Sequence, residues 1–239
     1  MEENKIKEKN EVNEKVYKEG ENYNPSMLPG NSQGLPDESF SETVILVDEA
    51  FLNKLSKHFG NGKYIKFDKV NFAYNLCKKQ RLKCKNIFYY TATPFQSSRP
   101  TEDEEKKKEG YNRFINKLKE KGVVIREGRC QRLKTEKGFE YKQKGVDVLL
   151  AIDLMKVPLV YRSMARVIII SSDSDFVPAI KEIQNLEIKI ILYTYYERKR
   201  NTNFSRNNEL IKSVYKYVLL TKEDFDNSKL NKENEKCIE

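Results

Sequence analysis

Short apolar runs rich in β-branched residues alternate along this chain with segments of helical spacing, and this alternation constrains the fold most. The runs cover residues 43–47, 86–90, 123–126, 167–171 and 188–193. The helical segments cover residues 68–79, 101–121, 145–156 and 173–185. Because strands that alternate with helices form parallel sheets covered on both faces, the sequence predicts an α/β fold with a mostly parallel central sheet.

Individual segments carry more detailed predictions. Asp68, Thr101 and either Asp173 or Ser174 are suitable N-caps for their helices. Residues 145–156 are apolar nearly all round, which predicts a buried helix. Residues 128–142 are polar around a central glycine and predict a hairpin or loop outside the core.

The dense apolar runs are confined to residues 42–225, and this sets the expected domain boundaries. Residues 1–41 are rich in Lys, Glu and Asn and then in Pro, Gly and Ser, while residues 226–239 are mostly Asp, Glu, Lys and Asn. Neither end has enough apolar surface to offset the entropy of ordering. We expect a flexible arm over 1–41, one domain over 42–225 and a disordered tail over 226–239.

Composition restricts the possible chemistry. The chain has four cysteines without a CxxC pair and one histidine, which leaves little material for a zinc site or a histidine-based triad. Its 45 Lys and Arg against 36 Asp and Glu give a net charge of +9, which favours a polyanionic partner. No apolar run approaches the ~18 residues of a membrane span, and the start lacks the apolar stretch of a signal peptide. We expect a cytoplasmic protein without a membrane partner; the sequence allows a homodimer without requiring one.

Aspartates follow two of the expected strands, where parallel sheets bind ligands. Asp48 follows the first strand, and Asp173 and Asp175 follow the fourth. Asp147 lies in the first turn of the helix over 145–156. Each alone fits an ordinary turn or cap residue. Together they predict a cluster whose repulsion is relieved by Mg²⁺ or Mn²⁺, which suits metal-assisted phosphodiester hydrolysis.

Two residues near Asp147 have less defined roles. Asp153 lies six residues further on, about 240° round the helix, so the two carboxylates cannot both point into one site. We expect a structural or supporting role for Asp153. Lys144 is a candidate to hold a phosphate or to pair with the cluster, and it fits an exposed lysine equally well.

These residues resemble a known family. Asp48 after an apolar strand, the step KGVD at 144–147 leading into VLLAIDL, and SSDSDFVP at 171–178 look like the three signatures of NYN domains, the branch of PIN-like ribonucleases that includes the LabA-like proteins. The resemblance covers about residues 43–220. It implies a three-layer αβα sandwich of PIN-like, Rossmann-like type, an aspartate site for Mg²⁺ or Mn²⁺, and RNA as the substrate. An endoribonuclease acting on single-stranded or loop RNA is therefore expected.

The sequence also departs from the family pattern. Glu49, Ala50 and Phe51 follow Asp48 where the family usually has a small residue and then an asparagine, and here an asparagine comes only at Asn53. Tyr215 stands where the family often has an aspartate. These departures keep open a catalytically weak or inactive RNA-binding or adaptor module on the same fold. Asn53, Ser172 and Ser174 are candidates to support the aspartates. Toprim domains and haloacid dehalogenase phosphatases fit less well, since they need Glu at Asp48 and Asp at Ala50, respectively.

A basic and aromatic loop after the fifth strand is the predicted RNA-binding surface. Loops at this end of a strand lie on the side of the aspartates, and cations with exposed rings suit unpaired RNA. A solvated loop is the alternative, and the excursion over 126–142 is the next candidate surface. The expected RNA-binding residues are Arg99, Arg198, Lys199, Arg200, Phe204 and Arg206.

Overall fold

The computed structural model describes residues 40–136, 138–198 and 202–230. The chain divides between Glu38 and Ser39 into two units, and the described residues belong to the second. Its elements are β1 (Ser41–Asp48), α2 (Glu49–Phe59), α3 (Lys69–Lys79), β2 (Leu82–Thr93), α4 (Glu102–Glu120), β3 (Val124–Thr135), β4 (Gly138–Lys144), α5 (Val146–Val160), β5 (Arg166–Ile170), the 3₁₀ turn η1 (Ser174–Phe176), α6 (Val177–Asn185), β6 (Lys189–Thr194), α7 (Asn208–Lys212), β7 (Lys216–Leu219) and α8 (Lys222–Asp226). The expected arm over 1–41 lies almost wholly outside the described residues.

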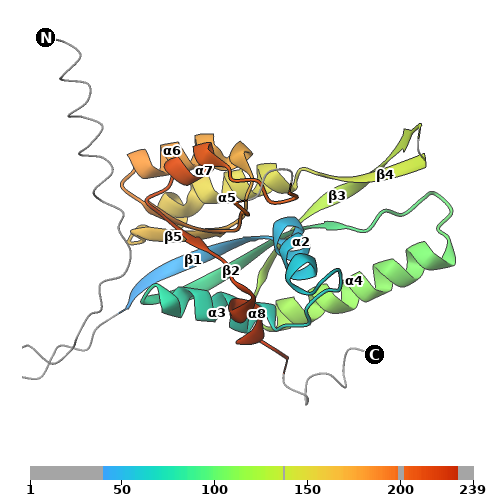
Figure 1. Cartoon of the computed structure of the whole chain (residues 1–239), viewed down its shortest axis with the longest axis horizontal. Coiled ribbons are helices and arrows are strands. Elements are labelled where there is room, and N and C mark those ends of the chain that lie inside the picture. Colours follow the sequence, from blue (N-terminus) through green and yellow to red (C-terminus); the bar gives the residue numbers. More distant parts are fainter. Residues whose placement is uncertain (1–39, 137, 199–201, 231–239) are drawn as a thin grey trace, which may run out of the picture. The chain divides into compact units, whose positions relative to one another are not determined.

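A seven-stranded sheet in the order β4-β3-β2-β1-β5-β6-β7 forms the centre of the described unit (Figure 1). Every neighbouring pair is parallel except β3 and β4. One core packs against α2, α3, α4 and α8, and the other against α5, α6 and α7. The predicted α/β fold with helices on both faces is therefore confirmed.

The central strands show why the sequence could predict this sheet. In β1, Ile45 and Val47 point into one core and Val44 and Leu46 into the other, and all four side chains are buried. A strand that is buried on both faces needs a continuous apolar run rather than an alternating one. β5 is built in the same way and pairs directly with β1. The two strands whose ends carry the predicted aspartates are thus neighbours.

The helix caps follow local chemistry. Asp68 accepts hydrogen bonds from the backbone N–H groups of Val70 and Asn71, and Thr101 forms a capping box with Glu104. Both predicted helix starts are confirmed. Helix α2 was not expected. Its polar residues mask a single apolar face made by Phe51, Leu52 and Leu55, and its N-cap is Asp48 itself.

Helix α5 corrects the prediction of a fully buried helix. Leu150, Leu154 and Val157 are buried on the inner side, but Val148 is 61% exposed, and Ile152 and Leu159 are also exposed. The helix lies on one face of the sheet, so only the side towards the strands and α6 is covered.

None of the helices in the described part of the chain has the length and apolar composition to cross a membrane.

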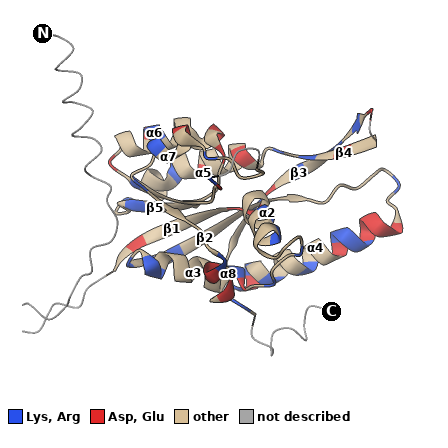
Figure 2. Cartoon of the chain, in the orientation of Figure 1, with Lys and Arg blue, Asp and Glu red and all other residues tan. Residues whose placement is uncertain are grey.

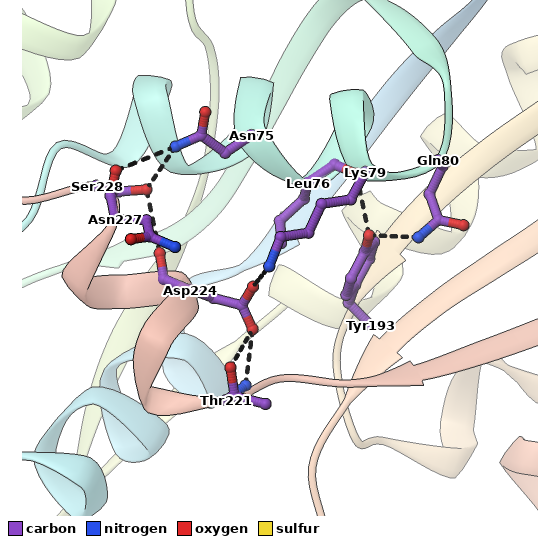
Figure 3. A network of polar contacts seen from close by, with 9 residues as sticks. All are labelled: Asn75, Leu76, Lys79, Gln80, Tyr193, Thr221, Asp224, Asn227 and Ser228. Carbon is purple, nitrogen blue, oxygen red and sulfur yellow. Dashed lines mark hydrogen bonds and ion pairs between the residues drawn. The ribbon is translucent and has the colours of Figure 1, made fainter. Parts of the chain in front are cut away.

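The C-terminal end of the described chain is anchored to α3 (Figure 3). Lys79 pairs with the buried Asp224 at 2.5 Å, and Asp224 also accepts hydrogen bonds from the backbone and hydroxyl of Thr221. Asn75 donates to Ser228 Oγ, and the backbone N–H of Asp68 donates to Ser228 O. Ser228 is fully buried. The expected tail from 226 is therefore wrong for 226–230, because these residues dock on α3, and 231–239 lie outside the described residues.

Candidate active site

The predicted aspartates gather at the carboxyl ends of β1 and β5. Asp48 is the last residue of β1, and Asp173 is the N-cap of η1, which follows β5. Asp147 lies in the first turn of α5. Because β1 and β5 are paired in parallel, their ends lie side by side, at the edge where α/β proteins bind ligands.

Asp48 is the buried centre of this group. Its side chain is 8% exposed, its Oδ2 accepts a hydrogen bond from Ser171 Oγ at 2.8 Å, and its Oδ1 accepts one from Phe51 N at 3.2 Å. The pKa of Asp48 is raised to about 6, mainly by burial and also by the charges of Asp147 and Asp173, against the lowering effect of these two hydrogen bonds. None of the ion pairs found among the described residues involves Asp48.

The pKa of Asp147 is also affected by neighbouring carboxylates. Burial raises the pKa of Asp147, and the nearby carboxylates of Asp173 and Asp175 add to the rise. Asp147 and Asp175 remain exposed to solvent. Asp147 and Asp173 therefore act electrostatically on the buried Asp48, and Asp173 and Asp175 act on the exposed Asp147.

Ser171 is the residue that the sequence reasoning did not select. Its hydroxyl donates to Asp48 Oδ2 and accepts the backbone N–H of Asp173 at 3.2 Å, so it links the two strand ends. Asp173 Oδ1 in turn accepts the N–H of Asp175 at 2.9 Å. The hydrogen bonds found in the described chain include none from the hydroxyls of Ser172 or Ser174 to these carboxylates. Ser171 directly follows the apolar strand β5, and that position was the available signal.

Glu49 and Asn53 form a separate pair. Glu49 accepts hydrogen bonds from Asn53 Nδ2 at 3.1 Å and from the hydroxyl of Thr91. The expectation that Asn53 supports the aspartates is therefore corrected: its amide donates to Glu49. Its place in α2, four residues after Glu49, brings the two side chains onto one helix face.

Asp153 is neutralised at another place on α5. Its two oxygens accept from Nε and Nη2 of Arg126, both at 2.5 Å, and Oδ2 also accepts from the hydroxyl of Tyr90 at 3.2 Å. This two-pronged arrangement is the strong form of an Arg–carboxylate pair. Asp153 therefore joins α5 to β2 and β3 and is not one of the groups that face Asp48.

The donor set suits a hard divalent cation, since it consists of carboxylate oxygens around a buried carboxylate. As the side chains stand, the described residues contain no group of three or more His, Cys, Asp or Glu side chains arranged to hold a metal ion. Asp48 is held by hydrogen bonds from Ser171 and Phe51, whereas none of the side-chain hydrogen bonds or ion pairs found among the described residues involves the exposed carboxylates of Asp147 and Asp175. The residues therefore fit such an ion by the chemistry of their donor atoms.

The predicted RNA-binding loop is corrected at Phe204. This side chain is 5% exposed, with its ring centroid 4.9 Å from that of His58 and 5.2 Å from that of Tyr195. It belongs to the core that packs against α2 and is unavailable to an RNA base. Arg99, Arg198 and Arg206 are exposed, and Arg206 lies over the ring of Tyr196. Lys199 and Arg200 lie outside the described residues.

Comparison with known proteins agrees with the geometry. The family model described as "NYN domain" matches residues 43–218, which is most of the chain and all of the sheet except the ends of β1 and β7. No curated protein matches the chain. The matched region contains all four aspartates and carries the αβα layers of a PIN-like nuclease fold. The chain therefore belongs to the NYN domain family.

Proposed function

We propose that this protein is a metal-dependent endoribonuclease that hydrolyses phosphodiester bonds of single-stranded or loop RNA. The main support for the proposal is that Asp48 is a buried carboxylate and that the charged groups acting on it are the carboxylates of Asp147 and Asp173. Such an arrangement is unfavourable by itself and becomes favourable when a divalent cation lies between the oxygens. Membership of a PIN-like nuclease family supports the same reading.

Asp48, Asp147, Asp173 and Asp175 would hold Mg²⁺ or Mn²⁺. A bound ion of this kind lowers the pKa of a water molecule and neutralises charge on the phosphate oxygens. Ser171 holds the carboxylate of Asp48 in one orientation through its 2.8 Å hydrogen bond. Asp173 is fixed by its role as the cap of η1, while Asp147 and Asp175 keep the freedom of exposed side chains. Two of the four proposed ligands, Asp48 and Asp173, are thus held by hydrogen bonds, and the other two, Asp147 and Asp175, are exposed.

Replacing Asp173 by asparagine tests the proposal. The amide keeps the shape and the cap but removes a negative charge, so Asp173→Asn should abolish cleavage of an unstructured RNA without lowering the melting temperature. Asp103→Asn makes the same change at an exposed aspartate of α4 and should cleave like the wild type. Full activity of Asp173→Asn at saturating Mg²⁺ would remove Asp173 from the site.

The metal requirement is tested on the wild-type protein. Cleavage should need Mg²⁺ or Mn²⁺, stop in EDTA and not return with Ca²⁺, which is larger and takes more ligands. Cleavage that continues undiminished in EDTA would contradict the proposal.

A catalytically weak RNA-binding or adaptor module is the second candidate. Glu49, Ala50 and Phe51 replace the usual first motif, and Glu49 is engaged with Asn53 and Thr91 rather than facing the aspartates. RNA binding that needs no metal, together with no cleavage by any purified preparation, would favour this module.

A further inference from the structure

The hairpin formed by β3 and β4 lies at one edge of the sheet, and its outer part projects away from α5 (Figure 1). All seven residues of β4 are exposed, and most of the outer half of β3 is exposed as well. A two-stranded ribbon with neither face in a core gains little from packing. The residues that it displays are therefore available to a partner.

Cations and aromatic rings are interleaved on this ribbon, and Figure 2 shows Lys and Arg on it. The described residues from Gly128 to Lys144, both included, contain five cations and two acids. The guanidinium of Arg132 lies 4.7 Å from the ring centroid of Phe95 and 4.6 Å from that of Phe139. Phe139 is 58% exposed and Tyr141 is 55% exposed. Flat groups held in place by one another suit the stacking of unpaired bases.

A hollow of about 510 Å³ lies at the root of the hairpin, where β3 and β4 meet the start of α5. Arg129 and Lys144 line it together with Val148 and Leu149, and the two cations are directly paired across the strands. Gly128 allows the close approach, since a Cβ there would lie 2.5 Å from the carbonyl oxygen of Lys144. Gly145 makes the turn into α5 with φ +80°.

This hollow lies beside the first turn of α5, the turn that carries Asp147. Gly145 and Val148 both line it, and Asp147 lies between them in the sequence, in the first turn of α5. The pairing register of the hairpin places Lys142 on the same face of the ribbon as Arg129 and Lys144. Three positive side chains therefore share one face of the ribbon, and Lys144 at its root is three residues before Asp147. Lys142 also contacts Glu140 at 3.6 Å.

We propose that the β3–β4 hairpin is the RNA-binding arm of this active site. Arg129, Lys142 and Lys144 bind successive phosphates of a single strand on one face of the ribbon. Phe139 and Tyr141 lie on the opposite face by the same register, so the strand passes over the free edge of β4 to stack its bases on them. This inference rests on the proposed function. It assigns substrate binding to the hairpin in place of Phe204, which is buried.

Charge and ring chemistry favour an RNA strand over a protein partner here. The outer edge of β4 is an exposed strand edge, and such edges also pair with a second copy of the same chain. A protein edge needs backbone groups, however, and makes no use of a cationic row on one face of the ribbon and exposed rings on the other. Pairing of two copies is accordingly the competing outcome of the test.

The first experiment removes the cationic row from the full-length protein. Arg129→Gln, Lys142→Gln and Lys144→Gln are combined, and binding of a short fluorescein-labelled unstructured RNA is measured in EDTA over a range of salt concentrations. Because each phosphate contact contributes about 0.7 to the log–log salt slope of a single strand, the slope should fall by about 2. The matched control combines Lys78→Gln, Arg81→Gln and Lys83→Gln, which removes the same charge between α3 and β2, at the opposite end of the sheet. The control should keep the wild-type slope.

The second experiment removes the rings. Phe139→Leu with Tyr141→Leu keeps apolar side chains in the strand but cannot stack, and it should weaken RNA binding about 5- to 150-fold with little change of salt slope. Circular dichroism and melting temperature should match the wild type in every variant, because these side chains lie outside the cores.

The outcomes separate this inference from the proposed function. Unchanged RNA binding by both hairpin variants, alongside wild-type protein that binds and cleaves RNA, would overturn the inference alone. Equal losses in the hairpin and control variants would also overturn it, since charge in general would then be the cause. So would a change from dimer to monomer in the hairpin variants with RNA binding intact. A wild-type protein that binds no RNA would overturn both.

Discussion

Two aspartates of this protein are equally buried and have opposite surroundings. Asp48 and Asp153 are each 8% exposed, but Asp153 receives two hydrogen bonds from the guanidinium of Arg126, whereas Asp48 faces Asp147 and Asp173. A third buried aspartate, Asp224, is paired with Lys79. The fold thus neutralises the carboxylates that hold its layers together and leaves one charge uncompensated at the strand ends. By that difference Asp153 is a structural carboxylate and Asp48 is the candidate metal ligand of the proposed function.

Replacing Asp48 should produce the largest loss of RNA cleavage. A small loss would mean that Asp48 does not differ from the structural carboxylates. Asp48→Asn is expected to reduce RNA cleavage by more than about 100-fold, beyond the loss typical for a partner outside a coordination shell. Its free energy of unfolding should stay equal or rise by up to about 2 kcal/mol, because an unfavourable buried charge is removed. Cleavage assays and urea denaturation measure the two effects. A strongly destabilised Asp48→Asn would place Asp48 with the structural carboxylates.

The pH dependence of stability is a second test of the difference between Asp48 and the paired aspartates. The pKa of Asp48 is raised from 3.8 to about 6 in the folded chain, so the folded state holds this proton more tightly than the unfolded state. The stability that comes from this tighter proton binding is therefore fully present below about pH 4. It is lost as the pH rises through 6, and the total loss is about 3 kcal/mol. Urea denaturation at several pH values should show this loss in the wild type and not in Asp48→Asn. Parallel curves for the two proteins would contradict it.

Asp153 should behave in the opposite way. Asp153→Asn leaves Arg126 without its carboxylate, and because Arg126 is one third exposed, we expect a loss of about 2 kcal/mol rather than the larger loss of a fully buried pair. Cleavage per folded molecule should remain close to that of the wild type. Thermal unfolding followed by assays well below the midpoint measures both. A large loss of cleavage in folded Asp153→Asn would mean that the pair also orients α5 and its Asp147.

Ser171 should give the smallest effect. Its hydrogen bond holds the pKa of Asp48 down, so Ser171→Ala should raise that pKa further and reduce cleavage at neutral pH by about 10-fold. The loss should shrink as the pH is raised, and Ser171→Thr, which keeps the hydroxyl, should restore activity. A loss that is the same at every pH would indicate a purely structural role.

Much of the fold follows from local patterns. The continuous apolar runs of β1 and β5 identify strands that are buried on both faces, and Asp68 and Thr101 mark helix starts by their own hydrogen bonds. The strand-end positions of Asp48 and Asp173 place them at one edge of the sheet. These features depend on neighbours within a few residues, which the sequence displays directly.

Helix α5 and Phe204 show where local patterns fail. The apolar residues of α5 surround the helix, so no period indicates that Val148 and Leu159 face outwards. Phe204 lies in a basic segment typical of an exposed loop, yet its ring packs against His58 and Tyr195. Burial of these side chains depends on which element covers them, and that element comes from elsewhere in the chain.

The α/β class, most of the strands and helices, the family and the choice of the four aspartates could all be predicted from the sequence, because each depends on residue types at fixed short spacings. The surroundings of each carboxylate became known only from the tertiary structure. Ser171, which orients Asp48, lies 123 residues away, and Arg126, which neutralises Asp153, lies 27 residues away. The charge state and orientation of a buried carboxylate depend on the groups within a few ångströms, and folding alone brings those groups together.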